Sequence, residues 1–169
     1  MKKYIILLLI LTFIGCSNKN NPSLTNLKVY NNATISEDYP FITDGNSLVF
    51  HYYFEAEDEE NIADDEFAED FFIEITTSGN AFTLNSDDLK ELSHLYRQYC
   101  FCGSINYSSI TAGLLEGVKK SNEDWSIFGQ ITLELGYIDE DTQEIFWQHE
   151  KELVLSGTFH SANIPIGID

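Results

Sequence analysis

The chain has 169 residues, of which 28 are aspartate or glutamate and 9 are lysine or arginine, so its formal net charge at pH 7 is −19. A surface that binds nucleic acid needs clustered basic residues to displace the counterions of the phosphates, and this composition excludes such a partner. Hydrophobic residues make up 43% of the chain, which is too many for a disordered polypeptide and enough for one domain with its own core.

The amino-terminal residues have the layout of an export signal. Lys2 and Lys3 precede an apolar run over residues 4–14, which is followed by Gly15 and Cys16. A helix that crosses a membrane needs about 20 apolar residues, and this run is roughly half as long. A basic start, a short apolar stretch and a small residue before a cleavage point are typical of a secretory signal peptide.

Residues 13–16, Phe-Ile-Gly-Cys, resemble the lipobox of bacterial lipoproteins. The resemblance is confined to residues 1–20 and departs from the family at Phe13, where leucine is usual. It implies that signal peptidase II removes residues 1–15 and that Cys16 then carries a diacylglyceryl group and an N-linked acyl chain. Two or more acyl chains anchor a protein stably in a membrane. An uncleaved anchor or an ordinary secretory signal is the alternative.

The residues that follow the expected anchor indicate location and domain organisation. Ser17 is not acidic, and by analogy with the sorting of enterobacterial lipoproteins this favours the outer membrane. Residues 16–26 are polar and lack periodicity, so we expect a flexible tether. Residues 27–169 show neither an internal repeat nor a second boundary, and we expect a single β-rich domain. The expected location is the bacterial cell envelope, with the membrane as a partner held through the lipid.

Two strands are expected in the first half of this domain. Alternation over residues 47–56 predicts a strand with an apolar core face and a second, partly polar aromatic face. The core face comprises Leu48, Phe50, Tyr52, Phe54 and Ala56, and the second face comprises Val49, His51 and Tyr53. Residues 71–77 predict another strand, with Phe71, Ile73 and Ile75 on one side.

The connection between these strands is strongly acidic, with ten acids among the sixteen residues from 55 to 70. Calcium takes about six to eight oxygen ligands, which such a cluster could supply. The candidate ligands are Asp58, Glu60, Asp64, Asp65 and Glu66. The stretch has no D-x-[DN]-x-[DN]-G loop and no glycine, so we favour a solvated connection whose charges deter edge pairing. No other cofactor is expected.

Residues 86–99 predict the one amphipathic helix of the chain. Ser86 is the expected N-cap, and two aspartates follow it at the positive end of the helix dipole. The apolar stripe at helical spacing consists of Leu89, Leu92, Tyr96 and Tyr99. His94 and Arg97 are expected to face away from this stripe, into water.

Cys100 and Cys102 come directly after this segment and are the two cysteines that remain if Cys16 is lipidated. An oxidising envelope favours their pairing. Residues i and i+2 of an extended chain have Cα atoms about 6.6 Å apart, near the upper limit for a disulfide. We therefore favour a strained disulfide, then buried free thiols, and lastly a metal or redox site. Two thiolates do not complete a zinc site, which takes about four ligands.

Three long strands are expected after the cysteines, joined by short polar turns as an antiparallel meander. Their core faces are predicted to carry Ile110, Ala112, Leu114 and Val118, then Trp125, Ile127, Ile131, Leu133 and Leu135, then Ile145, Trp147, Leu153 and Leu155. Strands without intervening helices indicate a mainly β fold, either an antiparallel β-sandwich or a partly closed β-barrel, with the one helix covering an end or a face.

No sequence motif assigns a catalytic residue. The four histidines form no H-E-x-x-H motif, and G-x-S-x-G, Walker and G-x-G-x-x-G loops are absent. Exposed aromatic and acidic groups could grip an envelope glycan or protein; the candidate aromatics include His51 and Tyr53 on one strand face and, near turns, Tyr30, Tyr39, Tyr107 and Tyr137. The sequence favours a non-catalytic, ligand- or partner-binding lipoprotein. An envelope hydrolase and a calcium-dependent adhesion or structural module are the alternatives.

Overall fold

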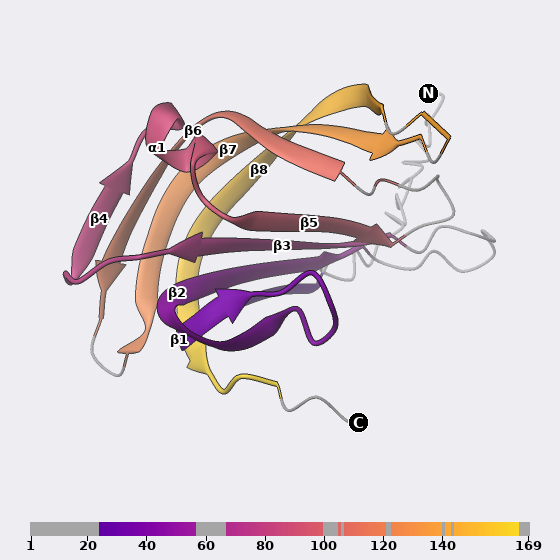
Figure 1. The fold of residues 1–169 in the computed structure, drawn as a ribbon. Helices are drawn as coiled ribbons and strands as arrows, with labels where there is room; N and C mark the ends of the chain where they lie inside the picture. Colours follow the sequence, from indigo (N-terminus) through magenta and orange to yellow (C-terminus); the bar gives the residue numbers. More distant parts are fainter. Residues whose placement is uncertain are drawn as a thin grey trace, which may run out of the picture.

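The computed structural model describes residues 24–56, 67–99, 105, 107–120, 123–139, 141–142 and 144–165, which contain eight strands and one short helix (Figure 1). In chain order the elements are β1 (Leu24–Ile35), β2 (Ile42–Glu55), β3 (Ala68–Ile75), β4 (Ala81–Leu84), α1 (Ser86–Lys90), β5 (His94–Tyr99), β6 (Tyr107–Lys119), β7 (Trp125–Ile138) and β8 (Ile145–Ala162).

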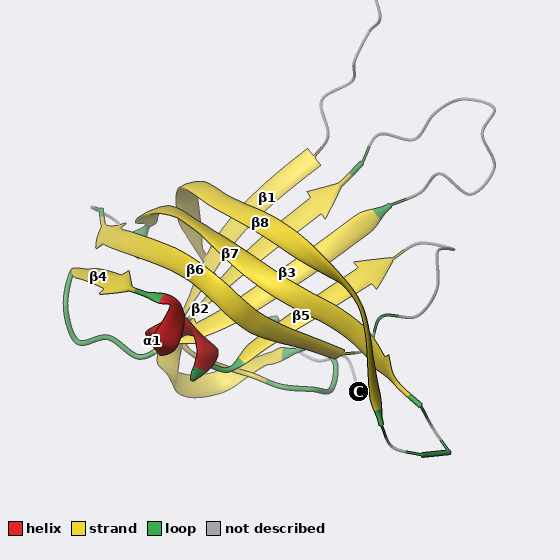
Figure 2. Cartoon of the chain, turned by 90° about the horizontal axis from the view of Figure 1, so that it is seen from above, coloured by secondary structure: helices red, strands yellow, loops and turns green. Residues whose placement is uncertain are grey.

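The strands form one sheet in the order β4-β6-β7-β8-β1-β2-β3-β5. The sheet curls so that β4-β6-β7-β8 faces β1-β2-β3-β5 (Figures 1 and 2). β8 joins the two halves, because it pairs antiparallel with β7 and parallel with β1. The edge strands β4 and β5 do not pair with each other, so the sheet is not closed. The predicted mainly β, sandwich-like fold is confirmed, and so is the antiparallel β6-β7-β8 meander.

The main core lies between the two halves and is built from the alternating inner positions of both. Phe50 of β2 lies at its centre, with ring centroids 5.8 Å from Trp125 of β7 and 5.5 Å from Phe159 of β8, edge to face in each case. Each fully buried large apolar side chain contributes about 1.5–3 kcal/mol. The predicted inner faces of β2 and β3 are confirmed, since Phe50, Phe71, Ile73 and Ile75 all belong to this core.

A second, smaller core covers the outer face of β1, β2 and β3. Its buried members are Tyr30, Ala33, Ile42, Val49 and Phe72. Phe71 and Phe72 are neighbours in sequence and point into different cores, so β3 is buried on both faces. This explains why residues 71–75 are an almost continuous apolar run rather than an alternating one. Tyr30, expected near a turn, is instead 4% exposed within β1.

The predicted helix over residues 86–99 is correct at its start and too long. α1 ends at Lys90, and residues 94–99 form β5, which pairs antiparallel with β3. The N-cap is Asn85 rather than Ser86: its side-chain oxygen accepts the Asp87 N–H at 2.8 Å. The stripe fails because Tyr96 and Tyr99 lie on opposite faces of a strand, where side chains alternate. Pairing with β3 outweighs the local helical pattern.

Two register shifts explain the wrong predictions of side-chain direction in the meander. A shift between Ile110 and Ala112 reverses the faces of β6, so that Leu114 is 47% and Val118 51% exposed. A second shift follows Leu135, where the β7–β8 hairpin continues beyond the facing half (Figure 2). Trp147, predicted in the core, is 42% exposed there, whereas Trp125 is buried as predicted.

Candidate functional site

The predicted lipidation, disulfide and calcium candidates all lie outside the described residues. These are the lipidation candidate Cys16, the disulfide candidates Cys100 and Cys102, and the calcium candidates Asp58, Glu60, Asp64, Asp65 and Glu66. Within the described ranges, no three His, Cys, Asp or Glu side chains are grouped so as to hold a metal ion. No helix in those ranges is long and apolar enough to cross a membrane.

The outer face of β2, β3 and β5 contains a histidine–carboxylate pair. His51 Nε2 lies 2.5 Å from Asp70 Oδ1, and the Tyr99 hydroxyl donates to Asp70 Oδ2 at 2.8 Å. The His51 ring stacks on Phe72, with centroids 4.2 Å apart. Burial and the hydrogen bond to Asp70 raise the pKa of Tyr99 to about 12. His51 was among the predicted binding aromatics, but its pairing with Asp70 was not predicted, because the pair forms only when β2 lies beside β3.

Among the described residues, no activated nucleophile lies beside this pair. A nucleophile or a substrate proton must lie within hydrogen-bond reach of the base. The described contacts of His51 are Asp70, Phe72 and Tyr30, none of which is an activated nucleophile. His51 Nδ1 is buried and has no partner within the described ranges. The described contacts link β2, β3 and β5 through the Asp70 carboxylate.

A second buried acid ties the two halves together from inside. Glu69 of β3 is 4% exposed and forms an ion pair with Lys151 of β8. The Tyr96 hydroxyl of β5 also donates to Glu69, at 2.9 Å. Burial and the neighbouring Glu69 charge raise the pKa of Tyr96 above its ordinary value. Glu69 therefore already has an ion-pair partner and a hydrogen-bond donor inside the fold.

One cleft lies along the β5 edge and is bounded by the loop before β2. Its volume is 330 Å³, and its lining includes Glu37, Phe41, Leu95, Arg97 and Ile105. The Arg97 guanidinium carbon lies 4.1 Å from the centroid of the Phe41 ring and 5.1 Å from that of Tyr99. The sequence placed Arg97 on the solvent side of a helix, and the β5 pairing puts it in this cleft instead.

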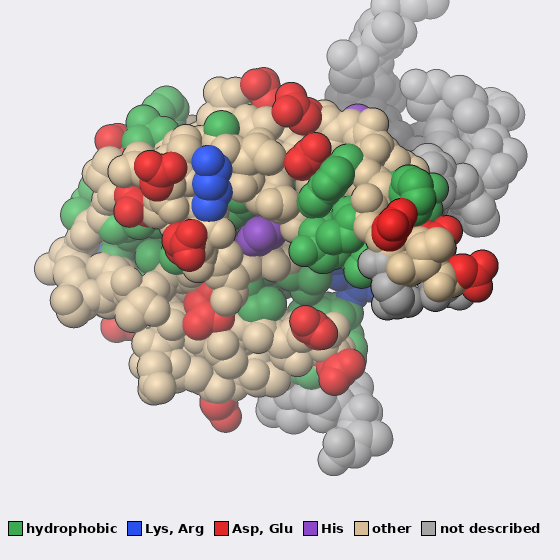
Figure 3. All heavy atoms as spheres, turned by 45° about the horizontal axis from the view of Figure 1, so that its top comes forward, with side chains coloured by type: hydrophobic (Ala, Val, Ile, Leu, Met, Phe, Trp, Pro, Cys, Tyr) green, Lys and Arg blue, Asp and Glu red, His purple; other side chains and the backbone are tan. Residues whose placement is uncertain are grey.

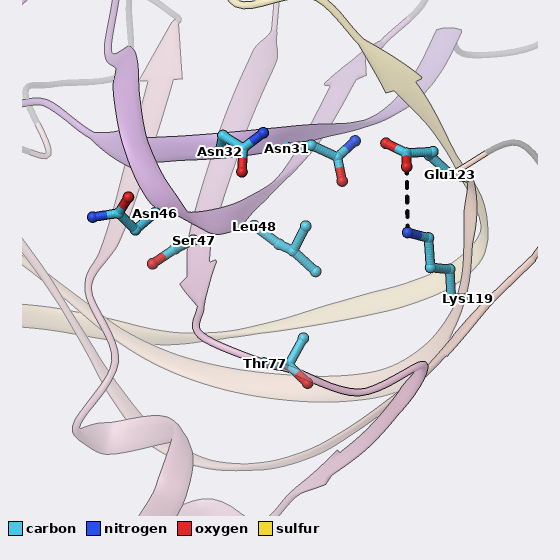
Figure 4. Close-up of a pocket in the computed structure, with 8 residues that line it drawn as sticks. All are labelled: Asn31, Asn32, Asn46, Ser47, Leu48, Thr77, Lys119 and Glu123. Carbon is cyan, nitrogen blue, oxygen red and sulfur yellow. Dashed lines mark ion pairs between the residues drawn. The ribbon is translucent and has the colours of Figure 1, made fainter.

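A second cleft, of 230 Å³, has a polar lining (Figure 4). Its side chains come from β1, β2 and the segments around β4 and β6, and they are Asn31, Asn32, Asn46, Ser47, Leu48, Thr77, Lys119 and Glu123. Lys119 Nζ and Glu123 Oε1 lie 3.5 Å apart, so the two charges of the lining neutralise each other. Amides and hydroxyls without a converging charge suit water or a weakly held polar ligand.

Four aromatic side chains near the end of the β7–β8 hairpin form what we call the aromatic platform: Tyr107, Tyr137, Phe146 and Trp147. The centroids of Tyr107 and Trp147 are 5.5 Å apart in an edge-on arrangement, and those of Tyr137 and Phe146 are 5.5 Å apart and stacked. Trp147 is 42% and Phe146 43% exposed. Tyr107 and Tyr137 were among the predicted binding aromatics, and the structure adds their partners Phe146 and Trp147.

Comparison with protein-family models, with curated proteins and with solved structures found no match. Function is therefore inferred from the side-chain geometry, because a fold alone does not define an activity. Figure 3 shows a face on which hydrophobic side chains lie among acidic ones, with few basic side chains between them. Such a surface suits recognition of a neutral or cationic partner.

Proposed function

We propose that the chain is a lipid-anchored, non-catalytic binding module of the bacterial envelope that holds a glycan through the aromatic platform. The observation that carries the proposal is the pair of aromatic contacts left half-exposed on the β7–β8 hairpin. The anchor rests on the resemblance of residues 13–16 to a lipobox. No activated nucleophile lies beside His51 among the described residues, and we favour binding over hydrolysis.

The platform is held rigidly by backbone geometry. Gly136 of β7 lies between its register partners Tyr107 on β6 and Trp147 on β8. A Cβ atom at Gly136 would come within 2.6 Å of the Phe146 carbonyl oxygen. With no side chain at this position, the rings of Tyr107 and Trp147 meet above the backbone of β7. A preordered ring pair loses little conformational entropy when a ligand binds.

The two aromatic pairs occupy opposite faces of the hairpin. Trp147 pairs with Gly136 and Phe146 pairs with Tyr137, so the two ring pairs come from successive strand positions. Successive positions of a strand point to opposite faces. One face of the hairpin therefore presents Tyr107 with Trp147, and the other presents Tyr137 with Phe146.

The surroundings of the platform favour a glycan over a lipid surface. The turn at the hairpin tip contains Asp139, Asp141 and Glu144. Hydrogen bonds from the Thr142 N–H and hydroxyl keep the pKa of Asp139 below its ordinary value, so this acid stays charged. Charged acids at the tip repel an anionic membrane. They also accept hydrogen bonds from sugar hydroxyls, while the rings stack on the apolar faces of the sugars.

Co-sedimentation of the detergent-solubilised full chain with insoluble envelope polysaccharide tests the proposal. We expect Trp147→Ala and Tyr107→Ala each to lower the affinity by about 3- to 10-fold, because each removes one half of an aromatic contact. Phe128→Ala is the matched control, since Phe128 is 66% exposed on β7 and outside the platform. Equal affinities for all three variants and the wild type, or no retention of the wild type, would contradict the proposal.

The anchor has its own test. Cys16→Ser should abolish incorporation of labelled palmitate in a bacterial host and leave a protein of higher mass, because the signal peptide is retained. Undiminished labelling of this variant would show that the acyl chains are attached elsewhere and would refute the lipobox assignment.

A further inference from the structure

We propose that the cleft along the β5 edge binds a small ligand that bears one carboxylate on an apolar body, with the Arg97 guanidinium as the carboxylate receptor. This site is separate from the aromatic platform, and the inference does not depend on the proposed function. Three features of the cleft support it. Arg97 has no ion pair with a described residue, a strained loop positions Phe41 against it, and the rest of the lining is largely apolar.

Arg97 is the single arginine in a chain with 28 acids, and it nevertheless has no ion pair with any described residue. Asp70 is its direct register partner across β3 and β5. Both oxygens of Asp70 are already engaged, Oδ1 with His51 and Oδ2 with Tyr99. The Asp70 carboxylate thus contacts His51 and Tyr99, and it forms no ion pair with Arg97.

Two aromatic rings, rather than an acid, contact the Arg97 guanidinium. Its central carbon lies 4.1 Å from the Phe41 centroid and 5.1 Å from the Tyr99 centroid. Stacking uses the flat face of a guanidinium and leaves its in-plane N–H donors available. Those donors form a fork that fits the two oxygens of a carboxylate. The arrangement is that of a preorganised receptor for one planar anion.

The loop that presents Phe41 is strained at this residue. Phe41 has φ 63°, a left-handed conformation that is unfavourable for a bulky side chain. Two backbone hydrogen bonds of 2.8 Å fix it, from Ser36 N–H to the Phe41 carbonyl and from Phe41 N–H to the Asp38 carbonyl. Strained residues of this kind concentrate at ligand clamps. Here the strain places an aromatic face directly against Arg97.

The rest of the lining defines the ligand. Phe41, Leu95 and Ile105 supply apolar contacts beside the guanidinium, and Glu37 adds a negative charge. One arginine in a cleft that is also lined by Glu37, in a strongly acidic chain, does not suit a phosphate group or a polyanion. A volume of 330 Å³ accommodates a molecule of the size of an amino acid or a monosaccharide. A single carboxylate on an apolar body matches all of these features.

Isothermal titration calorimetry on the detergent-solubilised full chain tests the inference with two pairs of probes. N-acetyl-leucine is compared with N-acetyl-leucinamide, and 4-methylpentanoate with 4-methylpentanamide, so that each acid has an apolar body and differs from its partner only in the carboxylate. We expect each acid that fits the cleft to bind at least about 10-fold more tightly than its neutral partner, because a charge-assisted bidentate contact is lost. The tighter acid identifies the source as a peptide carboxyl terminus or a short branched fatty acid.

Variants locate the site. Arg97→Gln should weaken binding of the acid by about 10-fold or more, and Arg97→Lys should weaken it less, because lysine keeps the charge but loses the planar fork. Lys119→Gln removes the same charge from the polar cleft and should leave binding unchanged. Acid and neutral probes that bind equally, or an Arg97→Lys variant with full affinity together with a Lys119→Gln variant that loses it, would overturn the inference.

Discussion

At the scale of single residues, the buried acids of β3 are held by ion pairs and hydrogen bonds to residues that are far away in sequence. Glu69 uses Lys151 and Tyr96, and Asp70 uses His51 and Tyr99. A buried carboxylate without such partners costs several kcal/mol. These contacts explain how a chain with a formal charge of −19 can bury acids between aromatic side chains.

Replacing Lys151 should therefore be costly. Lys151→Met removes the ion-pair partner of the buried Glu69 carboxyl group. We therefore expect the free energy of unfolding to fall by about 3–5 kcal/mol. The double variant Glu69→Gln with Lys151→Met should recover most of this loss. Lys90→Met is the control, because Lys90 and Asp87 form an exposed pair at 3.9 Å, worth at most about 1 kcal/mol. Urea unfolding measures all four proteins, and a loss at Lys151 no larger than at Lys90 would contradict the account.

Glu74 gives the fold a defined pH dependence. Burial raises the pKa of its carboxyl, but hydrogen bonds from the Ile35 N–H, at 3.0 Å, and the Thr34 hydroxyl, at 2.8 Å, outweigh burial and lower it. A lowered pKa in the folded state stabilises the fold above the unfolded pKa of about 4.3, and this stabilisation is lost as pH falls through the folded value.

We expect Glu74→Gln to lower the free energy of unfolding by about 1–2 kcal/mol at neutral pH, because a charge-assisted hydrogen bond is lost. The difference from the wild type should shrink as the pH falls below the unfolded pKa. Thermal unfolding across this range measures it, with Glu116→Gln on the exposed side of β6 as a control. A difference that does not change with pH would show that Glu74 acts through packing alone.

At the scale of elements, alternation in sequence predicts strands well and fails where the register shifts. β2 and β3 follow their predicted inner faces, while β6 reverses after Ile110. Gly113 marks the reversal with φ 156°, and a Cβ atom there would lie 2.7 Å from the Gln130 carbonyl oxygen. The predicted helix beyond Lys90 fails for a related reason, since the pairing of β5 with β3 is non-local.

Gly113→Ala should accordingly lower the free energy of unfolding by more than about 1 kcal/mol, because alanine disfavours this φ and its methyl group collides with backbone. Gly79→Ala is a matched control: its Cβ would meet no atom closer than 3.5 Å. Chemical denaturation compares the two variants. Equal stability of both would mean that the β6 backbone can change its register without cost.

The candidate sites depend on long-range pairing even more strongly than the elements do. Tyr107 and Tyr137 could be chosen from sequence because aromatic residues near turns are often exposed. Trp147 could not, because its parity along β8 matches that of Leu153 and Leu155 in the core. Arg97 could not either, since its place depends on β5 being a strand and on Phe41 reaching it from a loop far away in sequence.

At the scale of the whole molecule, a curled sheet with one parallel junction between β1 and β8 supports an acidic surface and a protruding aromatic hairpin. Like charges on such a surface repel one another and destabilise the compact state. We expect the melting temperature to rise with added sodium chloride, since salt screens this repulsion. Calcium chloride at the same ionic strength should give the same rise if residues 55–70 are a solvated connection. An additional rise specific to calcium would contradict that interpretation and assign a calcium site to this stretch.

A glycan bound on the aromatic platform would cover the Trp147 ring, and acrylamide quenching of tryptophan fluorescence measures this cover. The chain has two tryptophans; Trp125 is 1% exposed and Trp147 is 42% exposed, so quenching reports mainly on Trp147. We predict that envelope polysaccharide protects Trp147 from the quencher, and that Tyr107→Ala weakens this protection while Phe128→Ala does not. Polysaccharide that is retained by the protein while Trp147 remains fully quenchable would contradict the account.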